Sequence, residues 1–76
     1  MIKVGIIGCG KMADQHALQI LRIPGAEING VCDSEPLMSR QMAERFNIKH
    51  HFSTAQEMFD AVKPDVVHIT TPPPSH

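Results

Sequence analysis

Residues 2–13 of the chain read IKVGIIGCGKMA, and this stretch indicates how the polypeptide folds. Residues 2–7 form a short, mostly β-branched apolar run, which favours a buried strand over a helix. The run ends at Gly8-Cys9-Gly10, where we expect a tight turn. Beyond the turn, apolar residues recur at three- and four-residue steps, and they predict one buried helix face: Met12, Ala13, Ala17, Leu18 and Leu21.

The alternation of strand and helix continues along the chain. Pro24-Gly25 ends the first helix. Further strands are expected over residues 28–32, 48–52 and 65–70, and further helices over residues 35–46 and 55–62. Ser34 is the expected cap of the second helix, and Pro36 fits its first turn. The spacing from Thr54 to Glu57 is that of a capping box, which predicts the start of the third helix.

This element order predicts an α/β fold. The pattern β-α-β-α-β-α-β implies a parallel sheet with helices on both faces, and we expect the strand order 3-2-1-4. Such a sheet is part of a doubly wound, Rossmann-type fold, in which further strands would lie beside the fourth strand. Residues 66–69 are therefore expected to form an unpaired edge with one poorly covered face.

Composition limits the possible partners. The chain has 76 residues and a net charge of −1, from 7 Lys+Arg against 8 Asp+Glu. This length allows one small core, and the charge balance gives no general attraction to nucleic acid or to a membrane surface. No apolar run is long enough to span a bilayer, and the first residues lack the features of a signal peptide. Two cysteines are too few for a disulfide framework, so we expect a cytoplasmic protein.

The glycine turn has the pattern G-x-G-x-x-A, and each position has a physical reason. Gly8 permits the tight turn out of the strand, and Gly10 lets the backbone approach a pyrophosphate without a Cβ atom in the way. Ala13 is small enough for the helix to lie close to the sheet. The free N–H groups of Lys11 and Met12, at the positive end of the helix dipole, would bind the phosphates. In this context the pattern predicts dinucleotide binding.

An acidic residue stands where a ribose ligand is expected. Asp33 follows Gly8 by 25 residues, close to the spacing of about 20 that is typical of the carboxylate on the adenosine ribose. The alternative role for Asp33 is a helix N-cap, although Ser34 could take that role. A carboxylate accepts both ribose hydroxyls of NAD but repels the 2′-phosphate of NADP, and Arg40 is seven positions further on. We therefore expect NAD as the cofactor, with NADP less favoured.

Two motifs carry a resemblance to a known family. Residues 8–17, GCGKMADQHA, resemble the G-x-G-x-[IM]-A-x-x-H-[AL] opening of the glucose–fructose oxidoreductase and inositol dehydrogenase family (Gfo/Idh/MocA). Residues 65–76, DVVHITTPPPSH, resemble its D-x-V-x-I-x-T-P-P-x-x-H segment. The resemblance implies these cofactor-binding residues: Gly8, Gly10, Lys11 and Met12 on the pyrophosphate, Asp33 and Ser34 on the adenosine ribose, Thr71 and Pro72 along the path of the dinucleotide, and His76 near the nicotinamide side.

The resemblance also implies the activity of the whole protein. Members of this family are NAD(P)-dependent oxidoreductases that transfer hydride between the nicotinamide and a sugar, cyclitol or related hydroxylated small molecule. The family's E-K-P motif, whose lysine takes part in catalysis, and its substrate domain would follow residue 76. Residues 1–76 are therefore expected to be the N-terminal part of a dinucleotide-binding domain, without catalytic residues and inactive alone. We expect the parent protein to be a homo-oligomer.

Other functions share parts of this pattern. Reductases of the pyrroline-carboxylate type and hydroxyacid dehydrogenases also begin with G-x-G-x-M-A, but the T-P-P-x-x-H ending argues against both. A module that binds NAD without turnover stays open. A methyltransferase usually has a third glycine where this chain has Met12.

The remaining histidines and Cys9 have simpler interpretations. We interpret His16 as a packing or capping residue and His68 as a hydrogen-bonded or partly exposed one. His50 and His51 are adjacent, so on a strand their side chains point to opposite faces, and we expect no metal site. Cys9 lies near a helix N-terminus, which lowers thiol pKa values, but we expect it to be a small buried side chain without a chemical role.

Overall fold

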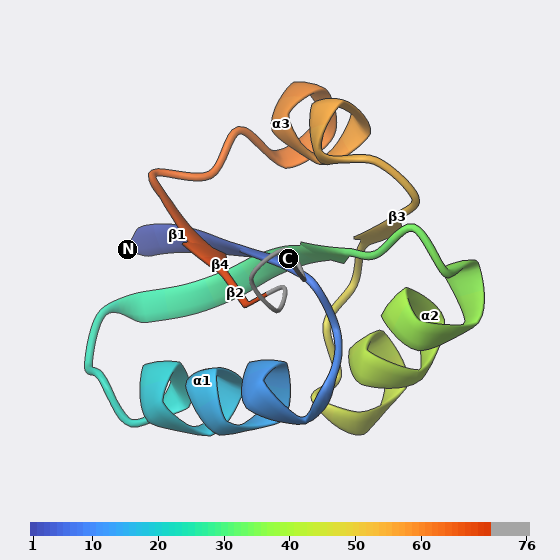
Figure 1. The fold of residues 1–76 in the computed structure, drawn as a ribbon. Coiled ribbons are helices and arrows are strands. Elements are labelled where there is room, and N and C mark those ends of the chain that lie inside the picture. Colours follow the sequence, from blue (N-terminus) through green and yellow to red (C-terminus); the bar gives the residue numbers. More distant parts are fainter. Residues whose placement is uncertain (71–76) are drawn as a thin grey trace, which may run out of the picture.

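The computed structural model describes residues 1–70, the Lys11 side chain excepted. Figure 1 shows its elements: β1 (Ile2–Ile7), α1 (Lys11–Leu21), β2 (Ala26–Cys32), α2 (Pro36–Arg45), β3 (His51–Phe52), α3 (Ala55–Val62) and β4 (Val66–Ile69). The strands pair in parallel to form one sheet in the order β3-β2-β1-β4. This confirms the predicted α/β class and strand order.

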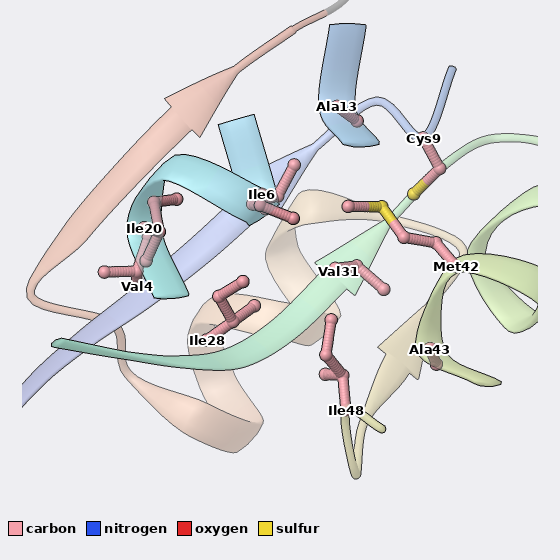
Figure 2. Close-up of a cluster of buried hydrophobic side chains, with 11 residues drawn as sticks. Val4, Ile6, Cys9, Ala13, Ile20, Ile28, Val31, Met42, Ala43 and Ile48 are labelled. Carbon is pink, nitrogen blue, oxygen red and sulfur yellow. The ribbon is translucent and has the colours of Figure 1, made fainter. Parts of the chain in front are cut away.

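The helices cover both faces of the sheet. α1 and α2 lie on one face, and α3 lies on the other (Figure 1). The larger core fills the space between the sheet and the α1–α2 layer (Figure 2), and it includes Val4, Ile6, Ala13, Ile20, Val31 and Met42. A smaller core under α3 contains Cys32, Met58 and Val62. None of the helices within residues 1–70 is long and apolar enough to cross a membrane.

The buried face of α1 differs from the predicted one. Ala13, Ala17 and Ile20 are buried, and their spacing places them on one side of the helix. The other expected members of the face are more than half exposed: Met12, Leu18 and Leu21. That part of the prediction is wrong. The two alanines let the helix lie close to the sheet, so the stripe that contains them is the one buried, although larger apolar side chains lie elsewhere on the helix.

The end of α2 explains why the third strand is short. Asn47 has a left-handed backbone conformation, with φ of 55°. The Ile48 N–H then donates a hydrogen bond to the Ala43 carbonyl at 2.8 Å, as in a Schellman-type helix end. This geometry directs Ile48 into the core. The third strand therefore covers only His51–Phe52, instead of the expected residues 48–52.

The sequence predicts a capping side chain at the start of both α2 and α3, and the structure shows one at α3 alone. Thr54 Oγ1 accepts a hydrogen bond from the Glu57 N–H at 3.1 Å, which confirms Thr54 as the N-cap and the predicted start of α3; the Glu57 carboxylate contacts the Thr54 hydroxyl at 3.2 Å. The N-cap of α2 is Glu35, which makes no side-chain capping hydrogen bond. The prediction that Ser34 caps α2 is therefore wrong. The Asp33 carboxylate accepts from the Glu35 N–H at 2.9 Å, and this bond sets the turn that precedes the helix.

β4 forms one edge of the described sheet. Among residues 1–70 it pairs with β1 alone. Val66 is 43% exposed and Ile69 is 69% exposed, although both are large apolar residues. This agrees with the expectation of a poorly covered edge at residues 66–69.

Candidate functional site

The carboxyl ends of β1, β2 and β4 meet at one edge of the sheet, and the direction of winding reverses there. α1 leads from β1 to β2 on one face, whereas α3 leads to β4 on the other face (Figure 1). In open α/β sheets, ligands bind in the crevice at this switch point, which here lies between β1 and β4. The glycine loop, residues 8–10, connects β1 to α1 at this position.

Gly8 turns the chain out of β1. Its φ is +93°, a left-handed conformation that glycine adopts without strain. The Gly8 N–H donates a hydrogen bond to the Cys32 carbonyl at 2.8 Å. The turn is therefore tied to the end of β2, which is the tight turn expected at this glycine.

Gly10 has a different environment. Its φ of −86° and ψ of −163° are open to any residue, and Gly10 is exposed. A Cβ atom built at Gly10 would meet no described atom within 4 Å. Neither backbone conformation nor packing within the described chain requires a glycine here. The space that a side chain would occupy lies in front of the helix, where the sequence predicts a pyrophosphate.

The start of α1 has backbone donors that the helix itself leaves without a partner. The N–H groups of Ala13 and Asp14 donate to the Gly10 carbonyl at 3.0 and 3.3 Å. The N-cap, Gly10, provides no side-chain hydrogen bond. The N–H groups of Lys11 and Met12 therefore have no partner within the helix, and they stand at the positive end of its dipole. This arrangement suits a phosphate group.

Asp33 lies directly beside the glycine loop. One carboxylate oxygen, Oδ2, accepts a hydrogen bond from the Cys9 N–H at 2.9 Å. The other, Oδ1, accepts from the Glu35 N–H at 2.9 Å. Asp33 is half-buried, whereas the neighbouring Ser34 is exposed. The carboxylate thus keeps acceptor sites for a ligand next to the loop that would hold the phosphates.

Thr70 also belongs to the site, although neither sequence motif identifies it as a site residue. Its hydroxyl donates a hydrogen bond to the Gly8 carbonyl at 2.7 Å and also lies 3.2 Å from the Ile7 carbonyl. Its N–H donates to the Ile7 carbonyl at 2.8 Å. The expected strand order already places the end of β4 beside the end of β1, so a hydroxyl residue just after β4 was the signal that could have identified it.

Cys9 is buried and points into the larger core (Figure 2). Burial, followed by the nearby Asp33 carboxylate, raises the pKa of the Cys9 thiol from 9.0 to about 12. Burial also raises the pKa of the Cys32 thiol. The start of α1 therefore does not activate Cys9, which is a small buried side chain as expected.

His16 and His68 contact each other across the α1–β4 boundary. Their Nδ1 atoms are 3.3 Å apart, and their ring centroids are 5.4 Å apart in an edge-to-face arrangement. His16 thus has a packing role, and His68 is partly buried and hydrogen-bonded. His50 and His51 are both exposed. Within residues 1–70 the structure gathers no group of three or more side chains suited to a metal ion.

The structure thus brings together most of the cofactor-binding residues expected from the sequence. Gly8 and Gly10 lie in the loop that Asp33 contacts, and Met12 lies in the first turn of α1; Ser34 is exposed and follows Asp33 in the chain. The expected roles of Thr71, Pro72 and His76 lie outside the described residues.

Comparisons with known proteins agree with this geometry. A family model described as an oxidoreductase family with an NAD-binding Rossmann fold matches residues 2–76. The chain is 36% identical over 72 residues to D-glucoside 3-dehydrogenase from Escherichia coli (strain K12), an alignment that covers 93% of this chain and 20% of that protein.

Solved structures show the same fold. The chain resembles an oxidoreductase from Agrobacterium radiobacter in complex with NAD+, L-tartaric acid and magnesium, with 28% identity, a TM-score of 0.86, and coverage of 93% of this chain and 21% of that one. It also resembles scyllo-inositol dehydrogenase from Lactobacillus casei with bound NAD(H) and scyllo-inositol, with 25% identity, a TM-score of 0.83, and coverage of 95% and 22%. The chain thus spans about a fifth of the length of these relatives.

The family match extends over nearly the whole chain, and NAD, the cofactor expected from Asp33, is the cofactor of the matched family. The loop, the switch point and the strand order are those of its fold. The chain therefore belongs to the Gfo/Idh/MocA oxidoreductase family, with the NAD-binding Rossmann fold.

Proposed function

We propose that this chain forms the N-terminal part of the dinucleotide-binding domain of an NAD-dependent oxidoreductase that acts on a sugar or cyclitol. The observation that carries the proposal is the environment of Gly10. Gly10 has an ordinary backbone conformation and open space at the Cβ position, so a ligand, rather than the fold, accounts for a glycine there.

The described residues fit the dinucleotide from the pyrophosphate to the adenosine ribose. The N–H groups of Lys11 and Met12 would bind the phosphate oxygens, with Gly10 leaving room for their approach. Asp33 would accept hydrogen bonds from the ribose hydroxyls, and Ser34 would assist it. By the family resemblance, Thr71 and Pro72 would follow the path of the dinucleotide, and His76 would lie near the nicotinamide side. When bound, the nicotinamide ring supplies the hydride acceptor or donor.

The same carboxylate supports a preference for NAD over NADP. A 2′-phosphate on the adenosine ribose would bring its negative charge against Asp33, in a half-buried position where repulsion is poorly screened. The guanidinium of Arg40 is paired with Glu44 at 3.1 Å on the exposed side of α2. It is therefore not arranged to neutralise a phosphate at this position.

The substrate class rests on the relatives. One is named a D-glucoside 3-dehydrogenase, and another was solved with scyllo-inositol. We infer a polyhydroxylated ring that is oxidised at a carbinol carbon, with acid–base residues supplied from outside this segment. A cytoplasmic location belongs to the same proposal, and it is supported by Cys9 and Cys32, which are both buried and free.

A pair of glycine variants tests the proposal in the full protein that carries this segment. Gly10→Val should keep the circular dichroism spectrum and cooperative thermal unfolding, with a small loss of stability because valine is a poorer N-cap than glycine, but it should abolish NAD binding in a calorimetric titration. Gly25→Ala is the control, since Gly25 also has open space at its Cβ position but has φ of +84° and lies in the α1–β2 turn. That variant should lose stability because of backbone strain and still bind NAD. Normal NAD affinity in folded Gly10→Val would rule out the phosphate site.

A further inference from the structure

We propose that two side chains, Asp33 after β2 and Thr70 after β4, hold the glycine loop in its binding conformation before the cofactor arrives. Asp33 is then a positioning residue for the loop in addition to a ribose ligand, and Thr70 is a second positioning residue. This inference rests on the proposed function only for its consequences in cofactor binding, because the contacts themselves exist without a ligand.

The contacts reach the loop from two sides. From β2, Asp33 Oδ2 accepts from the Cys9 N–H at 2.9 Å. From β4, the Thr70 hydroxyl donates to the Gly8 carbonyl at 2.7 Å. The Gly8 carbonyl, which accepts from Thr70, and the Cys9 N–H, which donates to Asp33, belong to the same peptide group. Both polar atoms of this one peptide are therefore bonded to side chains, so its orientation is fixed by residues far away in the sequence.

The orientation of this peptide decides where the next residues lie. Gly10 and the first N–H groups of α1 follow it directly, and they are the groups proposed to meet the pyrophosphate. A rotated peptide would move these donors away from a common target. Because ordering a loop during binding lowers affinity, a loop that is already ordered binds its ligand more tightly.

The acceptor capacity of Asp33 allows both of its roles. An ionised carboxylate offers about four lone-pair sites, and the Cys9 and Glu35 N–H groups occupy one site on each oxygen. One site on each oxygen remains for the ribose hydroxyls. An asparagine has a single acceptor oxygen, so it cannot replace both backbone contacts.

This double role has a consequence for cofactor specificity. Replacing Asp33 with a small residue removes the repulsion of a 2′-phosphate, but it also releases the Cys9 N–H. Affinity for NADP should therefore rise little, because the loop that binds the pyrophosphate is no longer held. A substitution that removes the charge of Asp33 and provides no acceptor for the Cys9 N–H should therefore fail to change the cofactor preference from NAD to NADP.

The test compares Asp33→Ala, Thr70→Val and Thr70→Ser in the full protein that carries this segment. Amide hydrogen exchange of Cys9, followed by NMR without cofactor, reports on the loop itself. We expect exchange at least about tenfold faster in Asp33→Ala, which has no side-chain acceptor, and in Thr70→Val, the change that a lost hydrogen bond of ordinary strength produces. Thr70→Ser keeps the hydroxyl and should keep the protection. NAD affinity should fall in parallel, about five- to thirtyfold for Thr70→Val.

Thr54→Val is the matched control, because it removes a threonine hydrogen bond at the start of α3, away from the loop. It should lower thermal stability but change neither the exchange of Cys9 nor the NAD affinity. If Asp33→Ala loses NAD affinity while Cys9 exchange stays at the wild-type rate, Asp33 acts on the ribose alone and the inference is wrong. Wild-type NAD affinity in folded Thr70→Val also overturns it. If the wild type does not bind NAD but the exchange pattern is as expected, the loop inference stands and the proposed function fails.

Discussion

Gly5 lies opposite Gly30 in the pairing of β1 with β2, and α3 packs over this pair through Met58. A Cβ atom at Gly30 would lie 3.2 Å from Met58 Cγ and 3.2 Å from the Phe52 ring. At Gly5 it would lie 2.8 Å from the flexible end of Met58. The absence of side chains on two neighbouring strands therefore lets α3 approach the sheet closely.

Gly30→Ala should destabilise the protein by about 1–3 kcal/mol, because the added methyl group overfills the space beneath α3. Urea unfolding measures the change. Met58→Ala should also be destabilising, since Met58 is fully buried. The double variant Gly30→Ala/Met58→Ala should be more stable than the sum of the two effects predicts, because the new methyl group partly fills the cavity. Simple additivity would show that Met58 does not limit the space at Gly30.

The ion pair between α1 and α2 gives a second prediction. Arg45 Nη2 lies 2.8 Å from Asp14 Oδ1, and the two side chains are 45% and 36% exposed. Arg45→Gln should lower the free energy of unfolding by up to about 1 kcal/mol at low salt, and by less in high salt. Arg40→Gln is the control, because the Arg40–Glu44 pair lies within one helix and is more exposed. A larger loss for Arg40→Gln would contradict the importance of the contact between helices.

Alkaline pH should destabilise the protein through Cys9. Its pKa is raised from 9.0 to about 12, so between these values the unfolded chain loses the thiol proton while the folded protein keeps it. The stabilising effect is complete below pH 9, and it decreases above that pH by up to about 1.4 kcal/mol per pH unit.

Urea unfolding of the wild type and Cys9→Ala at pH 8, 9.5 and 10.5 checks this prediction. The variant should lose less stability with rising pH, although Cys32 leaves it part of the dependence because the pKa of that thiol is raised too. Equal losses in the two proteins would show that Cys9 ionises equally easily in the folded and unfolded chains.

Cofactor preference follows from Asp33. Calorimetric titration of the full protein should give an NAD affinity at least about tenfold higher than the NADP affinity, a difference of about 1.4 kcal/mol. Asp33→Ala should reduce this difference in affinity mainly by weakening the binding of NAD, since the Cys9 N–H loses its acceptor. Equal binding of the two cofactors by the wild type would contradict the assigned position of the carboxylate.

The sequence predicted the element order because the apolar periodicity and the glycine turn depend on neighbouring residues, and the strand order followed because alternating strands and helices favour few topologies. It placed Ala13 and Ala17 correctly on the buried face of α1 but wrongly added Leu18 and two other large residues, since hydrophobicity favours them whereas close packing on the sheet selects the alanines. The third strand was overestimated because the left-handed Asn47 turns Ile48 into the core. Thr70 was missed for a different reason: its partner, the Gly8 carbonyl, is 62 residues away in the sequence.

The exposed edge of β4 gives the last prediction. A polypeptide of residues 1–76 produced alone should show no dehydrogenase turnover, because hydride transfer needs a nicotinamide held against a positioned substrate. It should also self-associate, since Val66 and Ile69 are exposed on a strand that, among residues 1–70, pairs on one side alone. Ile69→Lys should reduce this association, because a charged side chain on an edge strand opposes pairing with another chain. Leu18→Lys, which changes an exposed leucine on the outer side of α1, should leave the association unchanged.

Light scattering coupled to size-exclusion chromatography measures the mass of each variant, and an assay over a panel of polyols with NAD measures turnover. A monomeric wild-type polypeptide, or one that oxidises a polyol, would contradict this interpretation of the edge and of the missing catalytic residues.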